Sequence, residues 1–80
     1  MSEIKALARG LDMIDFVWSS NRSVGVGELA TMLQIDKSSA SRLARTLIQH
    51  GYLDNAGNSR RLIVGKRLVQ IGCEIDHRLA

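Results

Sequence analysis

The sequence predicts a single, mainly α-helical domain with a small β-hairpin. Apolar residues recur at helical spacing in four separate segments, and a run of turn-forming residues between two short apolar segments indicates one hairpin. A chain of 80 residues can build only one small core. Its apolar content of 45% is ordinary for a globular domain and indicates neither a disordered tail nor a membrane-spanning protein.

Apolar periodicity predicts the first two helices. The first runs from Ile4 to Ser19, and its apolar face is made of Ile4, Leu7, Leu11, Ile14 and Val17, with Trp18 beside them. Because tryptophan is usually largely buried, Trp18 is expected to be a partly buried residue of the core. After a strand stub at 24–26, Gly27 is expected to cap a short second helix from Glu28 to Leu33.

A third helix is predicted from Lys37 to His50, after a turn at 34–36. Asp36 is a favourable N-cap residue, and Gly51 suits the left-handed position that often follows a helix. At 100° per residue, one face is an apolar stripe of Ala40, Leu43, Ala44, Leu47 and Ile48. The opposite face is polar and basic, with Ser38, Ser41, Arg42, Arg45 and Gln49, and Lys37 at its edge.

A hairpin and a last helix are predicted for the rest of the chain. Residues 52–54 and 60–64 are expected as strands around the turn formers at 55–59, so the second strand begins with Arg60 and Arg61. The last helix begins at Lys66 and has an apolar face of Leu68, Ile71, Ile75 and Leu79. We therefore expect one domain over residues 1–65 and the start of a linker helix over residues 66–80.

The distribution of charge indicates a polyanionic partner. The net charge of +3 conceals a strongly basic middle segment, because residues 37–67 carry seven basic residues against Asp54 alone. The segments on either side are net acidic. A basic block of this kind is where a nucleic acid would bind, provided that the fold exposes it on one surface.

Three helices followed by a basic hairpin match the plan of a winged helix-turn-helix domain. A helix fits the major groove of B-DNA, which is about 12 Å wide. Arginine can bond guanine bidentately or clamp a phosphate, serine lets the backbone come close, and arginines on the hairpin could reach the backbone or an adjacent minor groove. The residues expected to contact DNA are Lys37, Ser38, Ser39, Ser41, Arg42, Arg45, Arg60 and Arg61.

Six segments resemble, in order and without gaps, the DNA-binding domain of isocitrate-lyase-regulator (IclR-type) transcription factors. They are Ala8–Ile14, Val26–Ala30, Asp36–Leu47, His50–Leu53, Leu62–Gly65 and Leu68–Gly72. Three positions depart from the family pattern. Gln34 lies near the usual turn glycine, Gly27 stands where the family has serine or threonine, and Leu62 replaces an aromatic residue.

The resemblance implies sequence-specific binding of double-stranded DNA in transcriptional control. It implies a homodimer on a palindromic operator, which an exposed apolar face on the last helix would favour. It also implies that a small-molecule effector binds only through a C-terminal domain absent from this chain, which we interpret as a fragment. No membrane partner, cofactor or metal is expected.

One motif indicates a different class of protein and is rejected. Gly25, Gly27 and Ala30 fit the G-x-G-x-x-A spacing of dinucleotide-binding loops. No long apolar strand precedes them, and Arg45 stands 20 positions after Gly25, where that motif needs an acid. We therefore interpret these residues as the start of a helix.

No catalytic or metal site is indicated by the remaining reactive residues. Cys73, His50 and His77 lack zinc-ligand spacing, and no Ser-His-Asp set can be argued because the serines lie on the polar face of the third helix. The single cysteine and the lack of an N-terminal signal sequence favour the cytoplasm, here that of a bacterium or archaeon, where the protein would lie at the nucleoid. We expect no enzyme.

Two other binding functions stay open at this stage. A winged helix that serves as a protein–protein interaction module would have an apolar or mixed-sign third helix, whereas this one has no acid. Binding of RNA or DNA by shape or by single-strand stacking is disfavoured by an aromatic content of only 4%.

Overall fold

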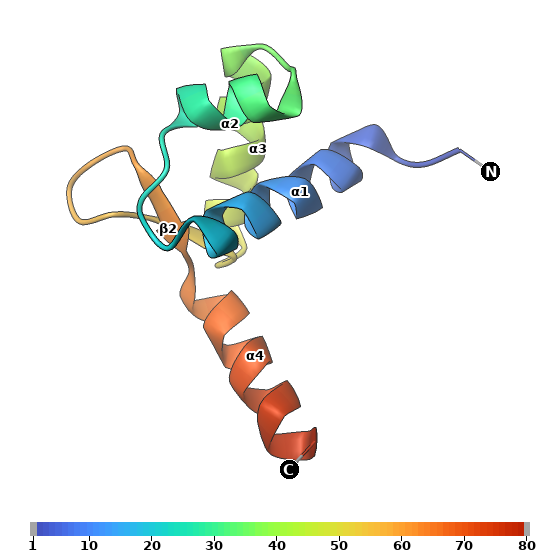
Figure 1. Ribbon diagram of the computed structural model, residues 1–80, viewed down its shortest axis with the longest axis vertical. Coiled ribbons are helices and arrows are strands. Elements are labelled where there is room, and N and C mark those ends of the chain that lie inside the picture. Colours follow the sequence, from blue (N-terminus) through green and yellow to red (C-terminus); the bar gives the residue numbers. More distant parts are fainter. Residues whose placement is uncertain (1, 80) are drawn as a thin grey trace.

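The computed structural model describes residues 2–79 and confirms a mainly helical fold with one hairpin (Figure 1). The elements are α1 (Lys5–Ser20), α2 (Val26–Leu33), α3 (Lys37–Gln49), β1 (Leu53–Asn55), β2 (Leu62–Val64) and α4 (Lys66–Leu79). The first three helices and the hairpin form one body, and α4 projects away from it (Figure 1). Among the described residues, no helix is both long enough and apolar enough to cross a bilayer.

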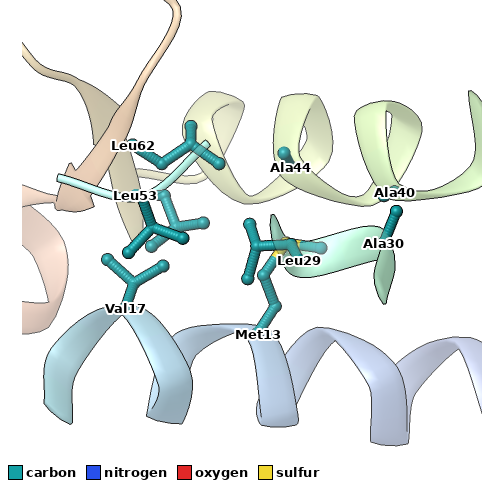
Figure 2. Packing of buried hydrophobic residues seen from close by; sticks show 9 residues of the cluster. Met13, Val17, Leu29, Ala30, Ala40, Ala44, Leu53 and Leu62 are labelled. Carbon is teal, nitrogen blue, oxygen red and sulfur yellow. The ribbon is translucent and has the colours of Figure 1, made fainter. Parts of the chain in front are cut away.

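The core lies between α1, α2, α3 and the hairpin. Figure 2 shows Met13 and Val17 of α1 pointing towards Leu29 of α2 and Leu53 of β1. The buried hydrophobic residues are Met13, Val17, Val24, Leu29, Ala30, Ala40, Ala44, Leu53 and Leu62. Within residues 2–79, α4 buries none of its side chains, so the core belongs to the first 65 residues.

The face of α1 that enters the core differs from the prediction. The buried residues of this helix are Gly10, Met13 and Val17, whereas Leu7 and Leu11 are exposed and Trp18 is 61% exposed. The expectation that Trp18 belongs to the core is therefore wrong. The cause is that α1 carries two apolar stripes, and periodicity finds both without indicating which one the other helices cover.

The second helix begins earlier than predicted. Its N-cap is Gly25, so Gly27 lies inside the first turn and the strand stub reduces to a single bridge between Val24 and Leu62. Glu28 explains the shift. It occupies the third helical position, where its Oε1 accepts a hydrogen bond of 3.1 Å from the Gly25 N–H, the reach-back typical of a helix start.

The turn between α2 and α3 is built from Gln34. Its φ of 58° lies in the left-handed region, which favours glycine, the residue that the family pattern places near here. The Ile35 N–H donates to the Ala30 carbonyl at 3.0 Å, which satisfies one of the last carbonyls of α2. The chain then enters α3 at Asp36, whose side chain accepts from the Ser39 N–H as predicted for an N-cap.

Two glycines join the end of α3 to the start of α4. Gly51 has a φ of 83°, which confirms the predicted left-handed residue after the third helix. A Cβ on Gly65 would lie only 2.3 Å from the Gly51 carbonyl oxygen, so the two backbones touch directly. The Arg67 N–H donates to that oxygen at 2.8 Å, which fixes the direction in which α4 leaves.

The hairpin is antiparallel, with Leu53 opposite Val64 and Asn55 opposite Leu62. β1 has the predicted length but begins one residue later, whereas β2 is shorter than predicted, so Arg60 and Arg61 lie in the loop before β2 rather than in the strand. Leu62 also pairs with Val24, through backbone hydrogen bonds of 2.9 and 2.8 Å. The hairpin is thus attached to the segment that leads into α2.

Candidate nucleic-acid interface

The two faces of α3 separate as the sequence predicts. Ala40 and Ala44 are buried against the core, and Leu43, Leu47 and Ile48 pack around them. Lys37, Ser38, Arg42 and Arg45 are exposed, and Ser39 and Ser41 are half-buried. Since the thirteen residues of α3 contain no carboxylate, the exposed face is basic along its length.

The arginines of α3 are free to bind a ligand. The ion pairs of residues 2–79 are formed by Arg22, Arg61 and Arg78, so Arg42 and Arg45 take part in none. They lie three residues apart, which on an ideal helix is about 4.5 Å along the axis and a turn of about 60° around it. Two unpaired guanidinium groups therefore point from one side of the helix into solvent.

The first turn of α3 is organised around the carboxylate of Asp36. It accepts the Ser39 N–H at 3.0 Å, the Ser39 hydroxyl at 2.6 Å and the Ser38 hydroxyl at 2.9 Å. These hydrogen bonds, above all the one from the Ser39 side chain, lower the pKa of Asp36 to about 2. The hydroxyl protons of Ser38 and Ser39 are thus committed to the cap, which leaves the two hydroxyl oxygens as acceptors.

The wing arginines occupy different environments. Arg60 is exposed and forms no ion pair within residues 2–79. The guanidinium of Arg61 is also exposed, but it is bonded to the protein surface: its Nε donates to the Ser23 hydroxyl at 2.9 Å and its Nη2 to a Glu28 oxygen at 3.2 Å. The structure therefore groups Lys37 to Arg45 on one helix and places Arg61 beside the start of α2.

Sequence reasoning missed two side chains near these residues. Arg9 of α1 lines a hollow of 260 Å³ together with Ser39, Arg42 and Thr46 of α3. Glu28 bonds both Arg22 and Arg61. Neither had a local signal, because Arg9 belongs to a net acidic segment and Glu28 resembles an ordinary first-turn acid of a helix.

The described fold and its basic helix agree with the comparisons to known proteins. A sequence model of the IclR helix-turn-helix domain matches residues 6–57. This chain belongs to the IclR helix-turn-helix family. Membership confirms the resemblance inferred from the six segments.

Individual relatives extend the match over most of the chain. The HTH-type transcriptional regulator TsaQ1/TsaQ2 of Comamonas testosteroni is 30% identical over 95% of this chain. The transcriptional repressor IclR of Escherichia coli (strain K12) is 29% identical over 88% of it. The chain covers only 27% and 26%, respectively, of the length of these two relatives.

Solved structures of the family have the same fold. The chain superposes on an IclR family transcriptional regulator from Brucella abortus with a TM-score of 0.78 and 27% identity, over 91% of this chain and 28% of that one. An IclR-type regulator from Alicyclobacillus acidocaldarius gives a TM-score of 0.81 at 22% identity, over 92% of this chain and 30% of that one. These matches confirm the winged helix-turn-helix fold.

Proposed function

We propose that this IclR-type domain places α3 in the major groove of an operator and rests its wing on the backbone or in the adjacent minor groove. The observation that carries the proposal is the division of α3 into a face that packs on the core and an opposite face with two unpaired arginines and no acid. A helix with side chains is about 10–12 Å across, close to the width of the groove.

Within this arrangement the residues have different tasks. Arg42 and Arg45 bond base edges, since a guanidinium matches guanine O6 and N7 bidentately. Lys37, at the start of α3, binds a phosphate with support from the helix N-terminus. Ser38, Ser39 and Ser41 let the backbone of α3 approach the DNA closely. Arg60 and Arg61 are the basic residues of the wing.

We further propose that the chain binds a palindromic operator as a homodimer. The exposed stripe of α1 consists of Ile4, Leu7, Leu11 and Trp18, which with the half-buried Ile14 repeat at alternating steps of three and four residues. That spacing is typical of the apolar seam between two helices of a coiled coil, and we call these residues the α1 seam. The exposed Val69, Ile75 and Leu79 of α4 offer a second apolar surface. A two-fold dimer would present two copies of α3 to two half-sites.

The regulatory context follows from the family. Two relatives are named as repressors, of which one is the acetate operon repressor of Salmonella typhimurium. Because this chain corresponds to about a quarter of such regulators, we place any small-molecule effector site outside residues 1–80. A regulator of this kind acts at the chromosome, in the cytoplasm of a bacterium or archaeon.

Selection from random duplexes tests the proposal directly. We expect the wild-type chain to enrich a palindromic sequence. For about four to six phosphate contacts per half-site, each half-site bound should contribute roughly −4 to −5 to the slope of log affinity against log salt concentration. A flat salt response, or no enrichment, would favour the protein-interaction module instead.

A double variant in α1 separates dimerisation from recognition of the operator sequence. The double variant Leu7→Asp, Leu11→Asp changes side chains that are 60% and 54% exposed, so the fold should persist. We expect it to sediment as a monomer and to lose preference for palindromes over single half-sites. A dimer that survives these changes would exclude the α1 seam as the interface.

A further inference from the structure

Arg61, which directly precedes β2, forms hydrogen bonds with two residues far earlier in the chain, Ser23 and Glu28. In addition to its bond to the Ser23 hydroxyl, Arg61 donates from Nη2 to the Ser23 carbonyl at 3.0 Å and to Glu28 Oε1 at 3.2 Å. We name Arg22, Ser23, Glu28 and Arg61 the clasp. It joins the wing to the loop before α2 and to the first turn of α2.

The carboxylate of Glu28 is the centre of the clasp. It receives two hydrogen bonds from Arg22, at 3.2 and 2.8 Å, one from Arg61 and one from the Gly25 N–H. These donors, with the Arg22 side chain first, lower the pKa of Glu28 to about 2, so the carboxylate is charged at neutral pH. One acid thus holds an arginine of the wing, an arginine of the loop and the N-cap amide of α2.

The backbone beside the clasp connects the same two segments. Leu62 follows Arg61 directly, is buried, and exchanges two hydrogen bonds with Val24, which follows Ser23. The side chain and the backbone therefore act at adjacent positions of both segments. An isolated exposed ion pair contributes little, but several hydrogen bonds around one carboxylate restrict the orientation of the guanidinium.

The bonding leaves the two wing arginines with different capacities. The Nε and Nη2 of Arg61 already donate to the protein, and its charge lies against Glu28. Arg60 is exposed and has no ion-pair partner within residues 2–79. A phosphate would have to compete with Glu28 for Arg61, whereas Arg60 is available without any rearrangement.

We propose that Arg61 is a positioning residue, which through Ser23 and Glu28 sets the place of the wing relative to α2, and that Arg60 is the wing residue that touches the DNA backbone. The assignment of Arg60 rests on the proposed function. The role of Arg61 in the free protein does not depend on it. The wing arginines therefore differ in kind, although they are neighbours of equal charge.

Amide hydrogen exchange of the free chain tests the clasp without DNA. We expect Arg61→Ala and Glu28→Gln to speed exchange at the amides of Val24 and Leu62 by roughly fivefold or more, because local opening becomes easier. Exchange at the α3 amide of Ala44 should stay unchanged, which separates this effect from global unfolding. Unchanged exchange at both bridge amides would overturn the positioning role.

Salt titration of duplex binding assigns the wing contact. Arg60→Ala should make the logarithmic slope shallower by about 0.9 for each half-site bound, the contribution of one phosphate. Arg61→Ala should lower affinity while keeping the slope, and Arg61→Lys should not restore affinity, because one ammonium cannot replace two separate guanidinium nitrogens. The matched control is Arg78→Ala, which removes an arginine paired with Glu74 in α4 and should change neither quantity.

The outcomes distinguish the two claims. If Arg61→Ala made the slope shallower by about 0.9 for each half-site and Arg61→Lys restored it, Arg61 would be a phosphate ligand and the division of roles would be overturned. An unchanged slope in Arg60→Ala would equally overturn the assignment of Arg60. If the wild type bound no duplex at any salt concentration, the proposed function would fail, while the exchange measurement would still decide the role of Arg61.

Discussion

Replacing Arg42 or Arg45 by alanine tests whether α3 recognises base pairs. The two residues are separated by about 4.5 Å along the helix axis, a little more than the 3.4 Å rise between base pairs, so each can address its own pair. A lost bidentate contact to a base costs about 1–3 kcal/mol, which corresponds to a loss of affinity of roughly 5- to 150-fold.

The assay is a titration of each variant with the selected operator and with a non-specific duplex of equal length. At least one of the two variants should bind the operator about tenfold or more weakly, and it should lose less affinity for the non-specific duplex. Because both side chains are exposed and unpaired within residues 2–79, the melting temperature should stay nearly constant.

A core variant calibrates the thermal measurement. Leu29 is fully buried, so Leu29→Ala should lower the stability by about 2–5 kcal/mol through the cavity that it leaves. If both arginine variants bound the operator as the wild type does, α3 would not be the recognition element. Equal losses on both duplexes would instead identify the arginines as phosphate ligands.

Three further substitutions probe the supports of α3, each by thermal unfolding. Gln34→Gly should raise the melting temperature by about 2–8 °C. The left-handed backbone conformation costs a residue with a Cβ more free energy than glycine loses through its greater conformational entropy in the unfolded chain. Gly65→Ala should destabilise by roughly 1–3 kcal/mol, because its Cβ would meet the Gly51 carbonyl. Asp36 has a pKa lowered to about 2 from 3.8, so its stabilising effect is complete above pH 4 and is lost towards pH 2. The difference in melting temperature between the wild type and Asp36→Asn should therefore disappear as the pH falls from about 4 to about 2.

Features that depend on neighbouring residues were predictable from the sequence. The N-cap at Asp36 and the left-handed Gly51 each involve partners within three or four positions, and the structure confirms both. The faces of α3 were predictable because its apolar stripe is unique. The core face of α1 was not, since the stripe with Leu7 and Leu11 is as apolar as the one with Met13.

Features that depend on distant residues were not predictable. Arg60 and Arg61 look equivalent in the sequence, and only the fold brings Ser23 and Glu28 to Arg61. One local feature was also missed: Glu28 starts α2 two residues earlier than glycine preference indicates, because its carboxylate bonds the Gly25 amide three positions before it. In both cases the deciding interaction is a hydrogen bond to a specific acceptor, for which neither composition nor periodicity carries a signal.

The small side chains at the centre of the fold explain how α3 could pack on the core and also perform the proposed recognition of DNA. Ala30 of α2 and Ala40 and Ala44 of α3 are all buried, so the two helices meet through methyl groups and approach closely (Figure 2). The larger residues of that stripe, Leu43 and Leu47, are only partly buried at its flanks. The polar face of α3 therefore contributes little to folding, and its side chains can be exchanged for others that recognise a different operator while the domain keeps its stability.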